Sequence, residues 1–285
     1  MQVAESLRQL WVYRRFVWEI TLLQLRLRYK LAVLGFLWSL LRPLFLSLVL
    51  YVVFSSMLSM MTIDMEGINY PSFIVSSMLL WSFLSSSLFD GVGSLLANSH
   101  LLQKVALPME AFPLTAVLAN VVNFGLSMAV VIPLLAIFGS LPIRWEWLML
   151  LPLTLHVLLL ASGLVCIMSV TQVFFRDVGI ILEVVMMGWF YFTPVFYPPK
   201  VVWGAHVPGG KMTEFLFVAN PVFPIMERYR WGLFGHSGLA GAPGALANPA
   251  APWVLWGASF LLSLVLFLVG VSLVRRRRTK IIDFL

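Results

Sequence analysis

A cationic cluster followed by a long apolar run dominates the N-terminal part of the chain. Arg26, Arg28 and Lys30 place three positive charges within five residues, and over residues 31–63 the only charge is Arg42. A helix needs about 20 apolar residues to cross a bilayer, and basic residues tend to stay on the cytoplasmic side of a span. The pattern therefore predicts a membrane-spanning helix that begins at the cytoplasmic face.

The composition extends this conclusion to the whole chain. Of its 285 residues, 61% are hydrophobic and only 11% are charged, whereas soluble domains have about 25% charged residues. Lipid offers no partner to unpaired backbone groups, so spanning segments are helical by default. We therefore expect an all-α integral membrane protein. Six apolar segments are candidate spans, at about residues 32–60, 71–97, 112–139, 147–174, 179–198 and 253–274.

Basic residues are distributed unequally between the two sides that six spans would create. The side with both termini receives thirteen of the 19 Lys and Arg residues, and the opposite side receives five. Both termini are therefore expected in the cytoplasm. Because the basic clusters abut apolar spans, they favour contact with anionic lipid, and no nucleic acid partner is predicted.

Residues 1–30 precede the first span and follow a different pattern. Apolar residues, among them Trp11 and Trp18, recur at helical spacing, and Arg15 falls elsewhere on the helical wheel. This predicts an amphipathic helix in the headgroup layer. Packing of the same helix on a soluble partner is an alternative, and the two can coexist. We expect residues 31–285 to form one membrane domain.

The connection between the fifth and sixth spans, about residues 199–252, is the longest segment outside the predicted spans. Its first part, up to Phe234, is apolar and aromatic with few charges, and we expect it to dip back into the outer leaflet. Its second part, from Gly235, is rich in Gly, Ala and Pro, which predicts a mobile loop.

The sequence offers little material for catalysis or metal binding. The single cysteine, Cys166, lies in an apolar segment, which excludes disulfide, zinc and iron–sulfur frameworks. The ionisable groups Arg42, Asp90, His156 and Glu183 lie on four different spans and form no catalytic motif. We expect His156 to be a hydrogen-bonded packing residue. Asp90 and Glu183 lie toward cytoplasmic ends, where water or a basic neighbour would satisfy them. No catalytic or metal site is predicted.

A nucleotide site is also missing from the sequence. A phosphate-binding loop requires G-x-x-x-x-G-K-[ST]. The nearest stretch, residues 205–212, has Ala205 in place of the first glycine and Met212 in place of the hydroxyl residue. Energy from ATP would therefore have to come from another chain, and no cofactor is expected on this one.

Two connections on the predicted cytoplasmic side have an unusual character. Residues 98–113 are expected to form one amphipathic turn framed by prolines. In the next cytoplasmic connection, Arg176 and Asp177 are expected to form an ion pair, with Asp177 near a helix N-terminus, where the helix dipole favours it. A functional contact and ordinary helix capping both remain open for these two residues.

Five motifs resemble, in the same order, the membrane subunit of ABC-2 type exporters, and more narrowly the branch that exports O-antigen, capsule or teichoic acid. They are LGFLWSLLRP (34–43), KVALPMEAFPL (104–114), FFRD (174–177), TPVFYP (193–198) and NPVFPIMERYR (220–230). The resemblance runs from about Leu25 to Arg230, and the six-span layout agrees with it. The insert at 235–252 has no counterpart in the family pattern. Gln103 and Met109 stand where members often carry basic residues.

The resemblance implies a homodimer of this subunit, bound to two copies of a cytoplasmic ATPase that would hold ATP and Mg²⁺. The subunit would lie in the bacterial cytoplasmic (inner) membrane. Two of its segments, loop 98–110 and the residues around 176–177, would dock on the ATPase. Segments 200–234 would form re-entrant gate helices at the outer face. The first and fifth spans would enclose a channel for a glycan or a lipid-linked glycan. The residues implied are Leu102, Lys104, Pro108, Glu110, Arg176 and Asp177 for ATPase coupling; Trp38, Arg42, Trp189, Phe190, Tyr191, Phe196 and Tyr197 for the channel; and Asn220, Pro221, Glu227 and Arg228 for the outer gate.

The aromatic content of residues 189–197, WFYFTPVFY, gives a physical reason to expect a sugar substrate. Sugar rings stack on aromatic faces without fixed hydrogen bonds, which suits a sliding polymer. Aromatic residues at the end of a span are also interfacial anchors or packing residues, so both interpretations stay open.

Three other functions make different predictions. An ABC-2 exporter of a small hydrophobic compound would have a narrow, charge-free apolar channel. An ion-coupled secondary transporter would show clustered intramembrane acids and repeat symmetry, and a membrane-embedded enzyme would show a polar catalytic cluster. The sequence has neither of the last two patterns, and the polysaccharide exporter remains the leading hypothesis.

Overall fold

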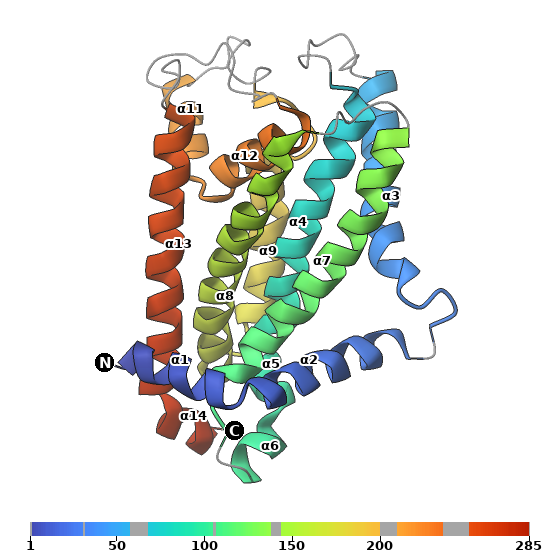
Figure 1. The fold of residues 1–285 in the computed structure, drawn as a ribbon. Coiled ribbons are helices and arrows are strands. Elements are labelled where there is room, and N and C mark those ends of the chain that lie inside the picture. Colours follow the sequence, from blue (N-terminus) through green and yellow to red (C-terminus); the bar gives the residue numbers. More distant parts are fainter. Residues whose placement is uncertain are drawn as a thin grey trace.

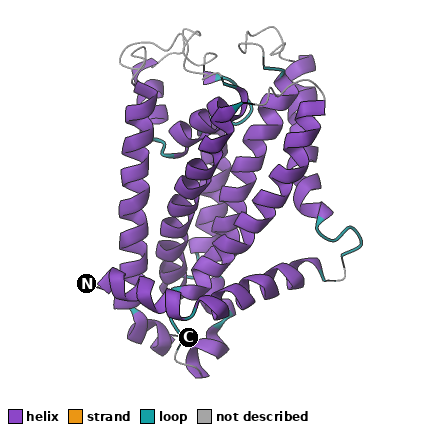
Figure 2. Cartoon of the chain, in the orientation of Figure 1, coloured by secondary structure: helices purple, strands orange, loops and turns teal. Residues whose placement is uncertain are grey.

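The computed structural model describes residues 2–30, 32–57, 68–104, 107–137, 144–199, 210–235 and 251–284. Within these ranges every regular element is a helix and no strand is present (Figure 2). This confirms the all-α prediction. The long helices run side by side, and both termini lie at the same end of the bundle (Figure 1). We call this the terminal end, and the end that carries α11 and α12 the distal end.

Within the described ranges, five helical segments are long and apolar enough to cross a membrane. They are Leu37–Ser55, formed by α3 (Leu37–Val52) and the start of the π-helix η1 (Val53–Met57); α4 (Tyr70–Val92); α7 (Ala111–Ile137); Trp145–Phe174, formed by the 3-10 helix η3 (Trp145–Met149) and α8 (Leu150–Phe174); and α13 (Ala251–Arg276). The first span begins about five residues later than predicted, because residues 33–36 form turns, and residues 58–60 lie outside the described ranges.

The predicted fifth span, residues 179–198, is helical over only part of its length. Helix α9 comprises Val178–Phe192, a predominantly apolar helix of 15 residues, which is about 22 Å long. It ends because Thr193 precedes Pro194 and takes the extended conformation (φ −103°, ψ 130°) that a following proline favours. The described residues therefore contain five helices of spanning length and one shorter apolar helix.

The predicted interface helix is present as two helices, α1 (Gln2–Val12) and α2 (Arg14–Tyr29). They run across the terminal end of the bundle rather than along the long helices (Figure 1). Trp11 and Trp18 are 70% and 52% exposed, as expected of side chains that meet the headgroup layer. One face of α2 packs on α7.

Helix α4 lies at the centre of the bundle and contacts α3, α7, α8 and α9. Of the residues in the apolar segment of α4, 72% are buried within the structure, whereas only 17% are buried in the apolar segment that α3 begins. Most of the surface of α3 is therefore available to lipid or to another chain. The serines and apolar residues of α4 form the interior against which the other helices pack.

Helices α8 and α13 approach each other closely through two glycines. A Cβ atom at Gly163 would stand 2.6 Å from the carbonyl carbon of Leu266, and one at Gly270 would stand 2.6 Å from the carbonyl oxygen of Gly163. Small residues allow such close backbone contact between membrane helices. Nearby, His156 is fully buried, with its Nε2 3.1 Å from Ser263 Oγ, which confirms the prediction of a hydrogen-bonded packing residue.

The glycine contact predicts a large difference between two similar substitutions. Gly163→Ala is expected to push α8 and α13 apart and to lower stability by about 1–3 kcal/mol, as overpacking does. Gly257→Ala on α13 is the matched control, because no atom lies within 4 Å of the added Cβ. Thermal unfolding of both variants in detergent measures the effect, and equal unfolding midpoints would contradict the close contact.

The distal end carries two shorter helices, α11 (Gly210–Ala219) and α12 (Val222–Phe234). Helix α12 crosses the bundle beside α8, α13 and α4, and nearly all of its residues are buried. It ends at Gly235, whose φ of 79° is the left-handed conformation that glycine adopts readily. Residues 200–209 of the predicted gate and 236–250 of the predicted mobile loop lie outside the described ranges.

The remaining helices are short and lie at the terminal end. They are α5 (Ser94–Ala97), α6 (Ser99–Lys104) and α14 (Arg278–Phe284).

Candidate functional site

The first predicted coupling connection is formed by α5, α6 and residues 107–110. Leu102 is 5% exposed and belongs to an apolar cluster with Val173 and Ile281, so it anchors the connection. Lys104 is exposed, whereas Pro108 and Glu110 are buried, with Glu110 4% exposed. Lys104 is thus the one predicted coupling residue of this connection, within its described part, that lies open to a partner.

The second coupling connection is the turn between α8 and α9. Arg176 and Asp177 are both exposed, and Asp177 is the N-cap residue of α9, as predicted from the helix dipole. The predicted ion pair between these two side chains is not present among the ion pairs of the described residues.

A residue that the sequence analysis did not assign holds this turn together. The Gln172 amide donates a hydrogen bond to the carbonyl of Arg176 (3.0 Å) and accepts one from the backbone N–H of Gly179 (2.8 Å). The two bonds fix the turn to the end of α8 and the start of α9. Glutamine near a helix end carries no distinctive sequence signal, so only the geometry reveals this role.

The aromatic residues predicted to line the channel pack largely within the subunit. Phe196 is 5% exposed and stacks on Phe190, with ring centroids 5.4 Å apart. Trp189 donates a hydrogen bond from Nε1 to Asn220 Oδ1 (2.9 Å), and Tyr197 donates one to the carbonyl of Tyr191 (2.8 Å). Only Tyr191, 61% exposed, presents a large surface.

The other two channel candidates lie together elsewhere. Trp38 and Arg42 line a cavity of about 390 Å³ between α2, α3, α4 and α7. Both side chains are exposed. None of the five aromatic residues around Phe196 lines this cavity. The seven predicted channel residues therefore form two separate groups.

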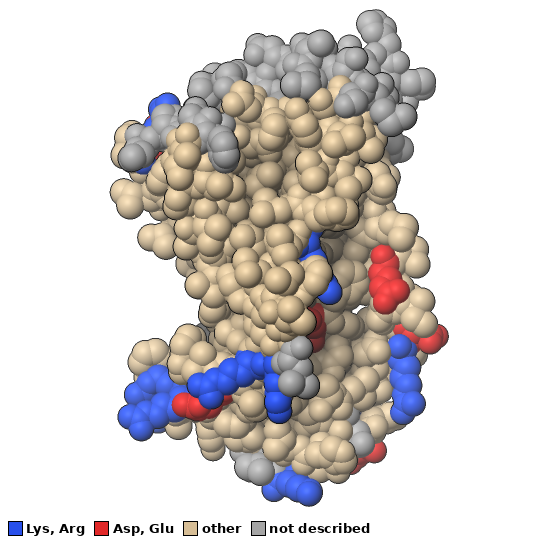
Figure 3. All heavy atoms as spheres, turned by 90° about the vertical axis from the view of Figure 1, so that its right-hand side faces the viewer, with Lys and Arg blue, Asp and Glu red and all other residues tan. Residues whose placement is uncertain are grey.

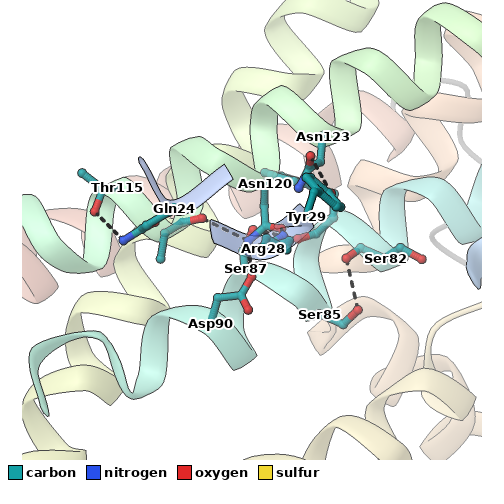
Figure 4. Close-up of polar contacts among 12 residues, drawn as sticks. Gln24, Arg28, Tyr29, Ser82, Ser85, Ser87, Asp90, Thr115, Asn120 and Asn123 are labelled. Carbon is teal, nitrogen blue, oxygen red and sulfur yellow. Dashed lines mark hydrogen bonds and ion pairs between the residues drawn. The ribbon is translucent and has the colours of Figure 1, made fainter. Parts of the chain in front are cut away.

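A polar network beside this cavity connects α2 to α4 and α7 (Figure 4). Arg28 Nη2 lies 2.5 Å from Asp90 Oδ2, and Arg28 Nη1 donates to Asn120 Oδ1 (2.9 Å). The Asn120 amide donates to the same Asp90 oxygen (2.7 Å). Asp90 thus has the basic neighbour that the sequence analysis anticipated, although the identity of that neighbour was missed.

Asn220 joins the end of α9 to the start of α12. It is 6% exposed, and its Nδ2 donates to Thr193 Oγ1 (2.9 Å) and to the carbonyl of Phe192 (3.2 Å). Its Oδ1 accepts from Trp189 and from the backbone N–H of Val222. Pro221, the N-cap residue of α12, accepts a hydrogen bond from Ser259 of α13. The predicted gate residues Asn220 and Pro221 are therefore structural junctions.

A buried ion pair lies in the middle of α12. Arg230 Nη1 contacts Glu227 Oε1 at 2.5 Å, and both residues are 1% exposed. Arg230 also donates to Ser77 Oγ of α4 (2.8 and 3.0 Å) and to the carbonyl of Pro194. This arginine, the last residue of the motif at 220–230, links α12, α4 and the segment after α9.

Arg228, the remaining gate candidate, is held by aromatic rings. Its guanidinium carbon lies 3.8 Å from the ring centroid of Trp253 and 5.7 Å from that of Trp231. Burial lowers the pKa of Arg228 to about 10, and the nearby Glu227 counteracts part of this shift. Arg228 is still a cation near neutral pH, and its charge is stabilised by the ring faces.

The described residues contain no group of three or more His, Cys, Asp or Glu side chains that would hold a metal ion. The candidate residues lie in the two connections at the terminal end, around the distal end of α9 and in α12, and near the start of α3.

Comparison with known proteins gives the family. The sequence profile described as ABC-2 type transporter matches residues 16–234. The O-antigen export system permease protein RfbA of Myxococcus xanthus is 28% identical over 253 residues, which cover 88% of this chain and 93% of that protein. The protein of the same name from Klebsiella pneumoniae is 28% identical over 190 residues, covering 65% of this chain and 71% of its own length.

The matched range includes both connections at the terminal end, α9 and all of α12. With five apolar helices of spanning length in its described part, the chain is a multi-pass protein of the bacterial cytoplasmic membrane. It belongs to the ABC-2 type transporter family, as a membrane transport subunit rather than an enzyme.

Proposed function

We propose that this chain is the membrane subunit of an ATP-driven transporter that exports a cell-surface polysaccharide, as a lipid-linked glycan of the O-antigen, capsule or teichoic acid type. The observation that carries the proposal is the 28% identity to an O-antigen export permease over nearly the full length of both proteins. The exposed Tyr191 on α9 offers a ring on which a sugar could stack.

The proposed assembly is a homodimer of this subunit with two copies of an ABC ATPase, which holds ATP and Mg²⁺. ABC-2 permeases work with such an ATPase, and the sequence lacks a phosphate-binding loop of its own. At the terminal end, Lys104, Arg176 and Asp177 are exposed and available to this partner. The sparsely buried α3 and the exposed apolar face of α9 are the surfaces proposed to meet across the dimer.

The proposed mechanism uses α9 as the connecting element. At its start, Gln172 fixes α9 to the coupling turn. At its end, Asn220 ties it to α12. A displacement of the coupling turn by the ATPase would therefore move α9 as a rigid rod and carry α12 at the distal end with it. Binding and hydrolysis of ATP on the partner would in this way open and close the channel.

The test is co-expression of this chain with ABC ATPase subunits of the same organism, in cells that lack their own exporter for that glycan. Co-purification of the two chains and ATP-dependent appearance of the glycan at the cell surface are expected. An ATPase variant that binds but does not hydrolyse ATP is the control. Recovery of the chain without an ATPase, or export of a small hydrophobic compound in place of the glycan, would overturn the proposal.

A further inference from the structure

A recess opens in the side of the molecule near the N-terminal end of α3. It is the cavity of about 390 Å³ between α2, α3, α4 and α7. Figure 3 shows basic atoms within a hollow on this side, with acidic atoms nearby and residues of other kinds around them. Because the recess lies between the interface helix and three long helices, a group that enters it sideways from the membrane stays at the depth of the headgroup layer.

The charge inside the recess is unbalanced. Arg28 is neutralised by Asp90, at 2.5 Å. Arg42 also lines the recess, and it forms no hydrogen bond or ion pair with any residue that the structure describes. It is the sixth residue of α3, about 8 Å along the helix from its start. A cation at this depth is costly unless an anion or water satisfies it.

The walls of the recess supply further hydrogen-bond donors. Asn123 is 7% exposed, and its Oδ1 accepts a hydrogen bond from Tyr29 (3.0 Å), which leaves its Nδ2 pointing to no partner among the described residues. Hydroxyl groups of Ser82, Ser86 and Ser127 line the same space. Figure 4 shows Asn123 on α7 beside Tyr29. A ligand that fits these groups carries negative charge and several acceptor oxygens.

Three apolar lining residues indicate that this ligand has an apolar part. Trp38 and Leu46 lie on the α3 side of the recess, and Phe124 lies on α7. An oxygen-rich anion joined to a hydrocarbon chain matches both kinds of wall. Arginine binds phosphate in bidentate fashion through its planar guanidinium, and such charge-assisted hydrogen bonds are about twice as strong as neutral ones.

We propose that this recess binds the phosphate group of a membrane lipid, with Arg42 as the principal cation and Asn123 and the serines as hydrogen-bond donors. The acyl or polyprenyl chain of the lipid leaves the recess along α3. Either a bilayer phospholipid or the lipid phosphate of an exported cargo has this chemistry. The site does not depend on glycan export, since a phospholipid of the cytoplasmic leaflet occupies it equally well.

The test measures lipid preference at Trp38, which lies in the recess. The full chain is placed in phosphatidylcholine nanodiscs that contain rising fractions of phosphatidylglycerol with brominated chains, and tryptophan quenching is recorded. Because the chain has 11 tryptophans, subtraction of the Trp38→Phe signal isolates the recess. Brominated phosphatidylcholine, a zwitterionic lipid with no net charge, gives the baseline level of quenching.

The expected result is a preference of about tenfold for phosphatidylglycerol at Trp38, which Arg42→Gln abolishes and Arg42→Lys keeps in part. Arg26→Gln is the matched control, since this exposed arginine of α2 lies outside the lining, and it should leave the preference unchanged. No preference in the unmodified chain, or the same preference in Arg42→Gln, overturns the proposal.

A second arm identifies the source of the phosphate. Unbrominated polyprenyl diphosphate is added as a competitor. Relief of quenching at a small mole fraction assigns the site to the cargo's lipid phosphate, and relief only in proportion to its abundance assigns it to bilayer phospholipid. Both results support a lipid phosphate site. The measurement uses no ATPase and no transport, so loss of the proposed export function would leave its outcome intact.

Discussion

Arg230→Met is expected to abolish export and to destabilise the subunit by about 3–5 kcal/mol. The substitution leaves the carboxylate of Glu227, which is 1% exposed, without its arginine, and removal of one partner from a buried ion pair carries a cost of this size. It also releases α12 from Ser77 of α4 and from Pro194. Thermal unfolding of the purified chain and the amount of surface glycan in complemented cells are the two measurements.

The double variant Glu227→Met/Arg230→Met is the control for this experiment. Because it removes both charges, it is expected to recover much of the lost stability. It does not restore the link from α12 to α4, so glycan export should remain low. Equal unfolding midpoints of the single variant and the unmodified chain would show that the pair does not stabilise the distal end.

Reversal of charge at the second coupling turn is expected to separate ATP hydrolysis from transport. In Arg176→Glu and Asp177→Arg, the altered side chains are exposed, so membrane insertion should be unchanged, and the unfavourable charge at the N-terminus of α9 in Asp177→Arg should lower stability by no more than about 1 kcal/mol. Like charges placed across a docking surface oppose correct contact. We expect export to fall by at least tenfold while the ATPase partner continues to hydrolyse ATP.

The matched control for the coupling turn is Arg278→Glu, an exposed arginine on α14 at the same end of the bundle. It lies outside both predicted connections and should leave export unaffected. Full export by both reversed variants would remove Arg176 and Asp177 from the coupling role. The two hydrogen bonds that Gln172 makes in this turn would then have only a structural role.

The long helices were predictable from sequence because their signal is local. Apolar runs such as residues 112–139 and 253–274 correspond closely to α7 and α13, since hydrophobic length alone determines whether a helix spans. The fifth span was predicted too long for an equally local reason: the apolar run continues past Thr193, but the backbone before Pro194 is not helical. Apolarity and helix formation are separate properties there.

The candidate site was less accessible to sequence reasoning, because its contacts join distant parts of the chain. Arg28 and Asn120 are 92 residues apart, and Arg230 and Ser77 are 153 apart. The periodicity of apolar residues along the sequence gives no information on contacts between such distant residues. Burial was also misjudged: a glutamate beside a predicted docking loop is normally exposed, yet Glu110 is 4% exposed. The family resemblance singled out segments of the chain, whereas individual contacts required the three-dimensional structure.

The hydrogen bonds between α2 and α7 impose an order on the assembly of the protein. Gln24, Arg28 and Tyr29 find their partners on α7 at residues that are 91–94 positions later in the chain. At about 5–20 residues per second, a ribosome needs roughly 5–18 s to synthesise that interval. During this time the N-terminal helices must rest on the membrane surface alone. Their amphipathic character, with Trp11 and Trp18 exposed, thus serves the nascent chain before it serves the finished transporter.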